Sequence, residues 1–329
     1  MSAKMTGFKK INVTILTGFL GAGKTTLLKR ILTERHGERI AIIENEFGQK
    51  SVDAELLFAH REEQVLELNN GCICCKVRGD LVRMLTNLHE RREKGEIAFD
   101  RVIIETTGLA DPAPVAQTFF VEEDVVEHYV LDAIVTVVDG VHAQVQLSEH
   151  HEALEQVAFA DRLLISKADL LDPCVTEALV QRLRGVNARA PIALVNFGET
   201  DIHNLLDVSG FSLQTVLGVD PNFLTDTAHQ HDDEIGSFVF ASRQPFHPEK
   251  VTSFFQDMIQ THGADLMRYK GVLSFSGFES RVVLQGVHMI MRSDLGAPWN
   301  GPDRESNLVF IGRRLPEPEI RQRLEECLA

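Results

Sequence analysis

The stretch that decides the predicted fold of this chain is Thr17-Gly18-Phe19-Leu20-Gly21-Ala22-Gly23-Lys24-Thr25-Thr26. Residues 18–25 match the pattern Gly-x-x-x-x-Gly-Lys-[Ser/Thr] at every fixed position. The apolar segment 11–16 comes before the pattern and is predicted to be a strand, while residues 27–32 continue with helical spacing. A strand before and a helix after this pattern are typical of a phosphate-binding loop. The stretch therefore predicts a nucleoside triphosphate site, with a chance match in a glycine-rich turn as the alternative.

The residue types in this stretch are the ones that phosphate binding needs. Glycines let the backbone turn sharply and point successive N–H groups at one anion, and the helix that follows adds its positive end. We expect Lys24 to reach the β- and γ-phosphates and the Thr25 hydroxyl to bind Mg²⁺. The predicted phosphate-binding residues are Gly18, Gly21, Ala22, Gly23, Lys24, Thr25 and Thr26.

Short apolar segments alternate with helical patterns through the first 200 residues, which predicts a parallel sheet covered on both faces. The sequence thus predicts an α/β fold, a Rossmann-like P-loop NTPase domain with a parallel sheet. Further predicted strands are 39–44, 64–68, 101–105, 133–138, 162–165 and 192–195. Predicted helices are 79–94, 114–120, 141–158 and 175–186.

A smaller α+β C-terminal domain is predicted after a polar segment that has no apolar periodicity. The predicted boundaries are 1–215 for the P-loop domain with its cysteine cluster, 216–234 for a linker and 235–329 for the C-terminal domain. Within the last domain, strands are predicted at 235–241, 267–275, 281–290 and 307–311, with helices at 248–261 and 316–327.

The segment Ser166-Lys167-Ala168-Asp169 follows a predicted strand and favours guanine as the base. A carboxylate at Asp169 can accept from the N1–H and N2–H₂ edge of guanine, and adenine lacks this pair of donors. The aliphatic stem of Lys167 is expected to lie over the base. Ser166 replaces the asparagine of the usual pattern, which predicts a weaker brace to the phosphate loop. A helix N-cap is the alternative reading.

Glu105 ends another predicted strand, three residues before Gly108. In P-loop NTPases a carboxylate at this strand end holds Mg²⁺ directly or through water, and the glycine lets the loop N–H meet the γ-phosphate. The longer arm of glutamate favours an outer-shell role. We therefore assign Lys24, Thr25 and Glu105 to catalysis, with a plain strand terminus as the alternative for Glu105.

The cysteine cluster Gly71-Cys72-Ile73-Cys74-Cys75-Lys76 indicates a soft metal or redox chemistry. Its spacing does not supply the four thiolates of a closed structural zinc site, so it leaves a coordination position open. Glu44 and Glu46, at the end of a predicted strand, offer oxygen ligands. Zinc suits such a set, and copper(I), cobalt and nickel stay open. Buried structural cysteines and a redox switch are the alternatives.

Composition excludes several other classes of protein. The formal charge of −15 argues against a nucleic-acid partner, which needs a basic face. No apolar run approaches the ~20 residues that span a bilayer, and the start has no apolar core of a signal peptide. Five cysteines, three of them within four residues, do not form a disulfide framework. These features predict a cytoplasmic protein without membrane contact.

Taken together, these motifs resemble those of the CobW-type P-loop GTPases, a metallochaperone family, and most of all its YjiA-type members. The resemblance also rests on 44–48, 105–112 and, near the end of the chain, 269–271 and 308–313. It implies GTP binding with slow hydrolysis, Mg²⁺, and zinc (or Co²⁺ or Ni²⁺) held by Cys72, Cys74, Cys75 and Glu44. It also implies a C-terminal α+β domain that covers the nucleotide domain.

The functional hypothesis is a GTPase that couples GTP binding and slow hydrolysis to the binding or delivery of zinc to a client metalloprotein. A nucleotide- or metal-dependent homo-oligomer is compatible with it, and the sequence does not identify the client. Two alternatives stay open, a GTP-binding thiol redox or metal sensor without delivery activity, and an ordinary P-loop ATPase or kinase.

Overall fold

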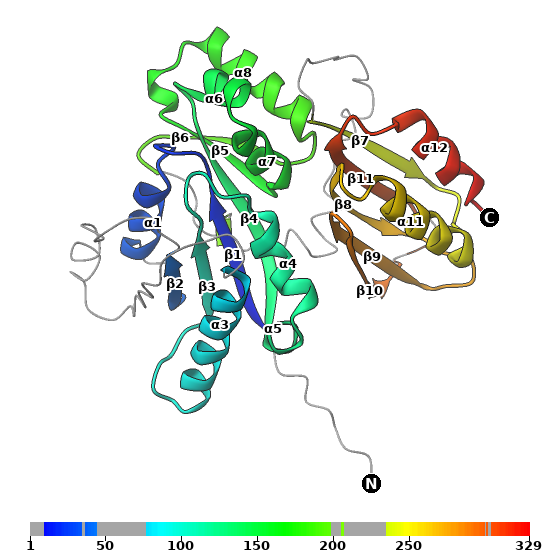
Figure 1. The fold of residues 1–329 in the computed structure, drawn as a ribbon, viewed down its shortest axis with the longest axis horizontal. Coiled ribbons are helices and arrows are strands. Elements are labelled where there is room, and N and C mark those ends of the chain that lie inside the picture. The colour runs from blue at the N-terminus through cyan, green and yellow to red at the C-terminus, as the bar shows by residue number, and fades with distance from the viewer. Residues whose placement is uncertain are drawn as a thin grey trace.

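The computed structural model describes residues 10–34, 37–44, 77–198, 205–206, 235–299, 301 and 304–329. These residues form a six-stranded and a five-stranded sheet, each with its own helices (Figure 1). The predicted α/β nucleotide domain with a smaller α+β C-terminal part is confirmed. The predicted strand at 64–68 and the boundaries at 215 and 234 lie outside the described residues, so these stay predictions.

The first sheet is parallel and has the strand order β2-β3-β1-β4-β5-β6. Its strands are β1 Ile11–Thr17, β2 Ile40–Glu44, β3 Arg101–Glu105, β4 Tyr129–Asp139, β5 Arg162–Ser166 and β6 Ile192–Val195. The chain runs from β1 to one side of the sheet and, after β3, crosses to β4 on the other side of β1. Ligands of such sheets bind where the order reverses, at the carboxyl ends of the strands. The phosphate-loop motif begins at the carboxyl end of β1.

Helices cover both faces of this sheet, which explains why its strands place apolar side chains on both sides. In β2, Ile40 and Ile42 pack in the same cluster as Leu28 of α1, whereas Ala41 and Ile43 pack with Leu85 of α3 in the cluster on the opposite face. The helices are α1 Lys24–Thr33, α3 Val77–Glu93, α4 Ala113–Val121, α5 Glu123–His128, α6 Ala143–Glu149, α7 His151–Phe159 and α8 Pro173–Val186, with a short 3₁₀ turn η1 at Ala168–Leu170. No helix in the described part of the chain has the length and apolar character needed to cross a membrane.

The single helix predicted at 141–158 is wrong, because α6 and α7 are separated at His150. The backbone of His150 is extended, with φ −125° and ψ 114°, and its ring stacks on Phe19 of the phosphate loop at 4.7 Å between centroids. The break thus places the start of α7 beside the phosphate loop. Helix α5 was not predicted either, and β4 begins at Tyr129, four residues before the predicted start.

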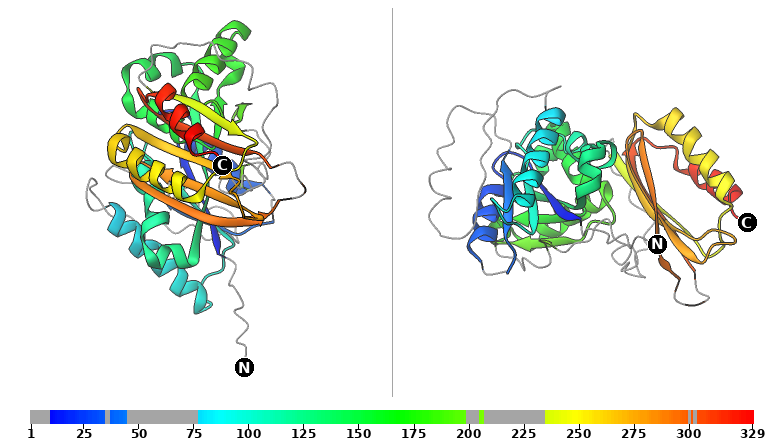
Figure 2. Two further views of the ribbon diagram at one scale, coloured as in Figure 1. Left: turned by 90° about the vertical axis from the view of Figure 1, so that its right-hand side faces the viewer. Right: turned by 90° about the horizontal axis from the view of Figure 1, so that it is seen from below.

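The second sheet is antiparallel, in the order β10-β9-β8-β11-β7. Its strands are β7 Ile235–Ser242, β8 Leu266–Leu273, β9 Ser280–Val287, β10 Ile290–Pro298 and β11 Ser306–Arg313. Helices α11 Pro248–His262 and α12 Glu317–Glu326 cover its outer face, and the other face looks toward the nucleotide domain (Figure 2). On that inner face Met267, Val309 and Ile311 pack in the core of the nucleotide domain.

The strand predicted at 281–290 is in fact a hairpin with a turn at His288 and Met289, since Val287 pairs with Ile290. Strand β10 was missed because none of its side chains is buried and its apolar residues do not alternate with polar ones. Backbone pairing to β9 holds it at the edge of the sheet.

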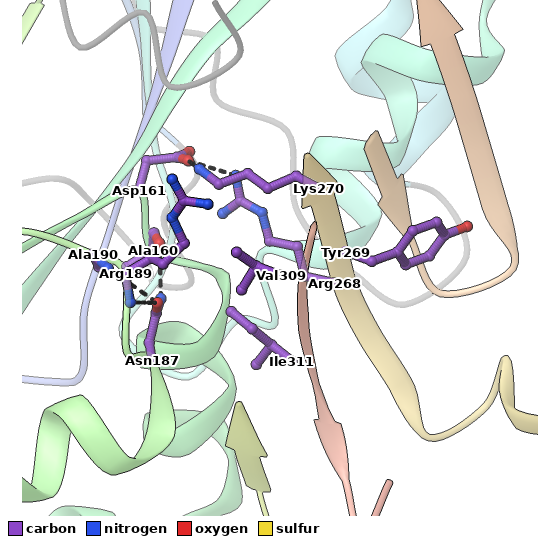
Figure 3. A pocket seen from close by; sticks show the side chains of 10 residues that line it. All are labelled: Ala160, Asp161, Asn187, Arg189, Ala190, Arg268, Tyr269, Lys270, Val309 and Ile311. Carbon is purple, nitrogen blue, oxygen red and sulfur yellow. Dashed lines mark hydrogen bonds and ion pairs between the residues drawn. The ribbon is translucent and has the colours of Figure 1, made fainter. Parts of the chain in front are cut away.

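A buried carboxylate, Asp161, joins the two domains (Figure 3). Arg268 Nη2 lies 2.6 Å and Lys270 Nζ 2.7 Å from its Oδ1, and both cations come from β8. The other oxygen, Oδ2, accepts the backbone N–H of Ile134 at 2.9 Å. Burial alone would raise the pKa of Asp161, but Arg268 and Lys270 outweigh it and lower the pKa to about 2. The carboxylate is therefore ionised and fully paired in the interface.

We predict that Asp161→Asn lowers the free energy of unfolding by about 3 kcal/mol, because removing one partner of a buried ion pair costs roughly this much. The change keeps an acceptor for Ile134, but it replaces the charged acceptor that faces Arg268 and Lys270 with an NH2 group, which cannot accept from them. Urea unfolding followed by tryptophan fluorescence and circular dichroism measures the loss. As a control, Asp257→Asn at the solvent-exposed pair with Arg323 should cost about 1 kcal/mol or less.

The stabilisation that Asp161 provides depends on pH, and its folded pKa fixes the direction of that dependence. Because the folded pKa of Asp161 lies below its unfolded value of about 3.9, its contribution is present above pH ~4 and is lost as the pH falls toward 2. The difference between the parent and Asp161→Asn should therefore shrink as the pH falls below 4. Equal stability of both proteins at pH 7 would contradict the role of Asp161.

Candidate nucleotide site

The predicted phosphate loop has the backbone geometry that its glycines allow. Gly18, Gly21 and Gly23 have φ values of 143°, 74° and 101°, a region that other residues rarely adopt. A Cβ on Gly18 would lie 2.2 Å from the carbonyl oxygen of Val137 on β4, so no side chain fits there. Gly23 is the N-cap of α1, which directs the free N–H groups of the first turn toward the loop.

The Lys24 side chain lies across the phosphate loop. Its Nζ donates to the carbonyl oxygens of Gly18 at 2.7 Å and Phe19 at 3.3 Å. Burial lowers the pKa of Lys24, and the charge of Glu105 acts in the opposite direction. The cation is thus held inside the loop, close enough to Glu105 for the two charges to interact.

Glu105 reaches this site because β3 lies beside β1 in register, with Leu16 opposite Glu105. The side chain is half-buried at the end of the strand. Thr25, in the first turn of α1, and Glu105 offer the hydroxyl and carboxylate oxygens that Mg²⁺ prefers, so the residues present fit this ion. The adjacent Thr106 donates its hydroxyl to the Thr17 hydroxyl at 2.7 Å, a contact between the two strand ends that the sequence did not reveal.

The predicted base-binding segment follows β5, and Ser166 braces the phosphate loop. Its hydroxyl donates to the carbonyl oxygen of Ala22 at 2.6 Å. Serine therefore does make the brace that was expected to be weakened by the loss of asparagine. The backbone N–H of Asp169 donates to Oδ1 of Asn196, which follows β6, and the Asp169 side chain is exposed to solvent. Asp169 thus lies on the surface beside the phosphate loop, where a base could meet its carboxylate.

Asp139, at the end of β4, is a member of the site that the sequence reading missed. It accepts from Lys167 Nζ at 2.7 Å and contacts His142 Nδ1 at 2.9 Å. Burial raises the pKa of Asp139, but the bonds to Lys167 and His142 overcome this and lower it. The ionised Asp139 holds Lys167, which has a left-handed backbone with φ 55°. The sequence signal that could have identified Asp139 was an acidic residue at the end of a predicted central strand.

A further missed residue is Gln156 of α7, which is buried and contacts the loop after β3. Its Nε2 donates to the carbonyl oxygens of Gly108 at 3.2 Å and Ala110 at 3.1 Å. The neighbouring Glu155 accepts from Arg313 of β11 at 2.6 Å. Helix α7 therefore touches both the loop of the nucleotide site and the C-terminal domain.

The predicted transition-metal site lies mostly outside the described residues. Cys72, Cys74, Cys75 and the side chain of Glu44 are not described, and these assignments stay predictions. Strand β2 itself ends at Glu44, whose backbone is paired in register with Glu105 of β3. The position of Glu44 is therefore next to the carboxyl end of β3. Within the described ranges, no cluster of three or more His, Cys, Asp or Glu side chains could hold a metal ion.

Comparison with protein families identifies the chain. Residues 12–194 match the model of the CobW/HypB/UreG nucleotide-binding domain. The chain belongs to this family. Residues 235–328 also match the cobalamin synthesis protein cobW C-terminal domain, which agrees with the second sheet and its helices.

Relatives match this member of the CobW/HypB/UreG family along nearly its whole length. It is 43% identical to the zinc chaperone YjiA of Escherichia coli (strain K12) over 94% of this chain and 96% of that protein. The zinc chaperone CobW of Pseudomonas aeruginosa is 33% identical over 97% of this chain and 92% of that protein. The crystal structure of Zn(II)-bound YjiA GTPase from E. coli superimposes with a TM-score of 0.76, covering 98% of this chain and 100% of the other at 35% identity.

We predict that Asp169→Asn weakens GDP binding by about 10- to 100-fold, because hydrogen bonds to a charged partner contribute roughly 1.5–3 kcal/mol. Competition against a fluorescent guanine nucleotide measures this. Asp172→Asn, three residues further on, removes the same charge from another exposed carboxylate and should leave the affinity unchanged. If Asp169→Asn bound GDP as tightly as the parent does, Asp169 would not read the base.

Proposed function

We propose that this chain is a metal-binding GTPase that couples GTP binding and slow hydrolysis to the binding of zinc and its delivery to a client metalloprotein. The observation that carries the proposal is the pairing of Glu44 with Glu105 at the ends of two neighbouring parallel strands. Glu44 is a proposed metal ligand, and Glu105 belongs to the nucleotide site. A change at the γ-phosphate can therefore reach Glu44 through the neighbouring strand end.

The nucleotide half of the proposal assigns a role to each described residue. The loop of Gly18, Gly21, Ala22 and Gly23, together with Thr26, holds the phosphates with backbone and hydroxyl groups. Lys24 exchanges its two loop carbonyls for the β- and γ-phosphates. Thr25 and Glu105 hold Mg²⁺, which neutralises charge that develops on the phosphates. Gly108 offers its N–H to the γ-phosphate, and Lys167 and Asp169 bind guanine.

The metal half rests on the cysteine segment and on the relatives. Cys72, Cys74, Cys75 and Glu44 supply thiolate and carboxylate ligands that suit zinc, with Co²⁺ or Ni²⁺ as further candidates. Two full-length relatives carry the name zinc chaperone, and the superimposable E. coli GTPase was crystallised with Zn(II). These findings favour zinc as the cargo of this chain too.

Coupling between the two sites requires that the metal binds unequally to the GTP and GDP states. We propose that GTP and GDP favour different arrangements of Glu44 and the cysteines, one that holds the metal and one that releases it. A tenfold change in zinc affinity needs only ~1.4 kcal/mol of coupling free energy, which the gain or loss of one ligand can supply.

Partner contacts are proposed at the face that carries the phosphate loop. Leu20 and Leu109 are 56% and 53% exposed there, although both are large apolar side chains. Leu20 also lies against Gly108, so the two residues belong to one surface. A client protein or a second copy of this chain would cover them in a nucleotide-dependent way.

We predict that zinc affinity, measured by competition with a chromophoric chelator, differs about tenfold or more between the GDP complex and the complex with a non-hydrolysable GTP analogue. Cys74→Ser should weaken zinc binding and abolish this difference, because a thiolate ligand is lost. Cys174→Ser, at an exposed cysteine of α8, is the matched control and should behave as the parent does. Equal zinc affinities in the two nucleotide states would contradict the coupling.

A further inference from the structure

Gln156 is a buried polar side chain whose amide makes two bonds to the same loop. Only 1% of the residue is exposed, and its Nε2 donates to the carbonyls of Gly108 and Ala110. These partners lie 48 and 46 residues before Gln156 in the chain. A primary amide has two N–H donors, so this one side chain can satisfy both carbonyls. No other natural side chain of this length offers the same pair without adding a charge.

The loop that Gln156 holds lies between the phosphate loop and α7. Before Gly108, the Thr106 backbone N–H donates to the Leu16 carbonyl at 3.0 Å and the Thr106 hydroxyl donates to the Thr17 hydroxyl. In the middle, a Cβ on Gly108 would lie 2.7 Å from the backbone nitrogen of Leu20. The chain is therefore fixed before Gly108 by β1 and after Gly108 by Gln156.

Gln156 is itself held in place by the sheet. Its backbone carbonyl accepts the hydroxyl of Thr136 on β4 at 2.7 Å. Its Oε1 is buried and has no hydrogen-bond partner among the described residues. A buried acceptor without a partner is unfavourable, so an apolar side chain would suit the packing better unless the two donors have a use.

We propose that Gln156 is a positioning residue for GTP hydrolysis, which holds the 108–110 loop so that the Gly108 N–H faces the γ-phosphate. This inference rests on the proposed function, because it takes the γ-phosphate contact of Gly108 from there. Preorganised donors stabilise charge in the transition state without reorganising during the reaction. GDP has no γ-phosphate, so its affinity does not depend on this loop.

The test compares Gln156→Met and Gln156→Glu with the parent. Methionine has a similar length without donors, and glutamate places a carboxylate against the two carbonyls. We expect the kcat for GTP, expressed per GDP-binding site, to fall 10- to 100-fold in both variants. The Kd of a non-hydrolysable GTP analogue should rise about three- to tenfold, while the Kd of GDP stays within twofold. Gln146→Met on α6, where the side chain makes no bond to this loop, should leave all three values unchanged.

The outcomes separate a positioning role from a structural one. An unchanged kcat, a parallel loss of GDP and GTP-analogue binding, or loss of all nucleotide binding would each overturn the inference. Lys24→Ala serves as the reference for the proposed function. If the parent hydrolyses GTP and Lys24→Ala does not, the GTPase part of the proposed function stands even where the Gln156 variants behave as the parent does.

Discussion

The buried carboxylate of Asp161 is the interaction on which the arrangement of this protein depends. It lies immediately before β5, accepts a hydrogen bond from the Ile134 N–H of the neighbouring strand β4, and pairs with two cations from the C-terminal sheet. Arg268 also donates to the carbonyl oxygen of Phe159, the last residue of α7. A buried charge that is paired on several sides tolerates little displacement, because any lost partner leaves it desolvated and uncompensated. The C-terminal sheet is therefore fixed to the nucleotide domain at the corner where α7 ends.

Helix α7 connects this part of the domain interface to the nucleotide site. Its beginning lies beside the phosphate loop, where His150 stacks on Phe19, and its middle holds the loop after β3 through Gln156. Glu155, on the same helix, pairs with Arg313 of β11. Burial and the charge of Asp111 raise the pKa of Glu155, and His151 and Arg313 oppose that shift. One helix thus carries contacts to the phosphate loop, to the Gly108 loop and to the C-terminal sheet.

The sequence predicted the parts of this structure that residues close together in the chain determine, such as strands and tight turns. Strands β1, β3 and β5 are short, mostly apolar segments, and the glycines of the phosphate loop are required by backbone sterics, so both were predictable. The pairs that organise the site were not, because they join distant segments. Asp139 and Lys167 are 28 residues apart, and Asp161 and Arg268 are 107 residues apart. The break at His150 was missed because helical spacing continues across it, and β10 because backbone pairing rather than apolar burial holds it in the sheet.

In the proposed function, metal binding and GTP hydrolysis are coupled through the adjoining ends of β2 and β3. The most direct measurement is GTP turnover by the reduced, metal-free protein with and without one equivalent of zinc, in parallel with Cys74→Ser. We expect zinc to change the rate in the parent and to leave the rate of Cys74→Ser unaltered. If zinc left the turnover of the parent unchanged, or changed that of both proteins equally, the nucleotide and cysteine sites would be independent in this chain and the proposed coupling would be wrong.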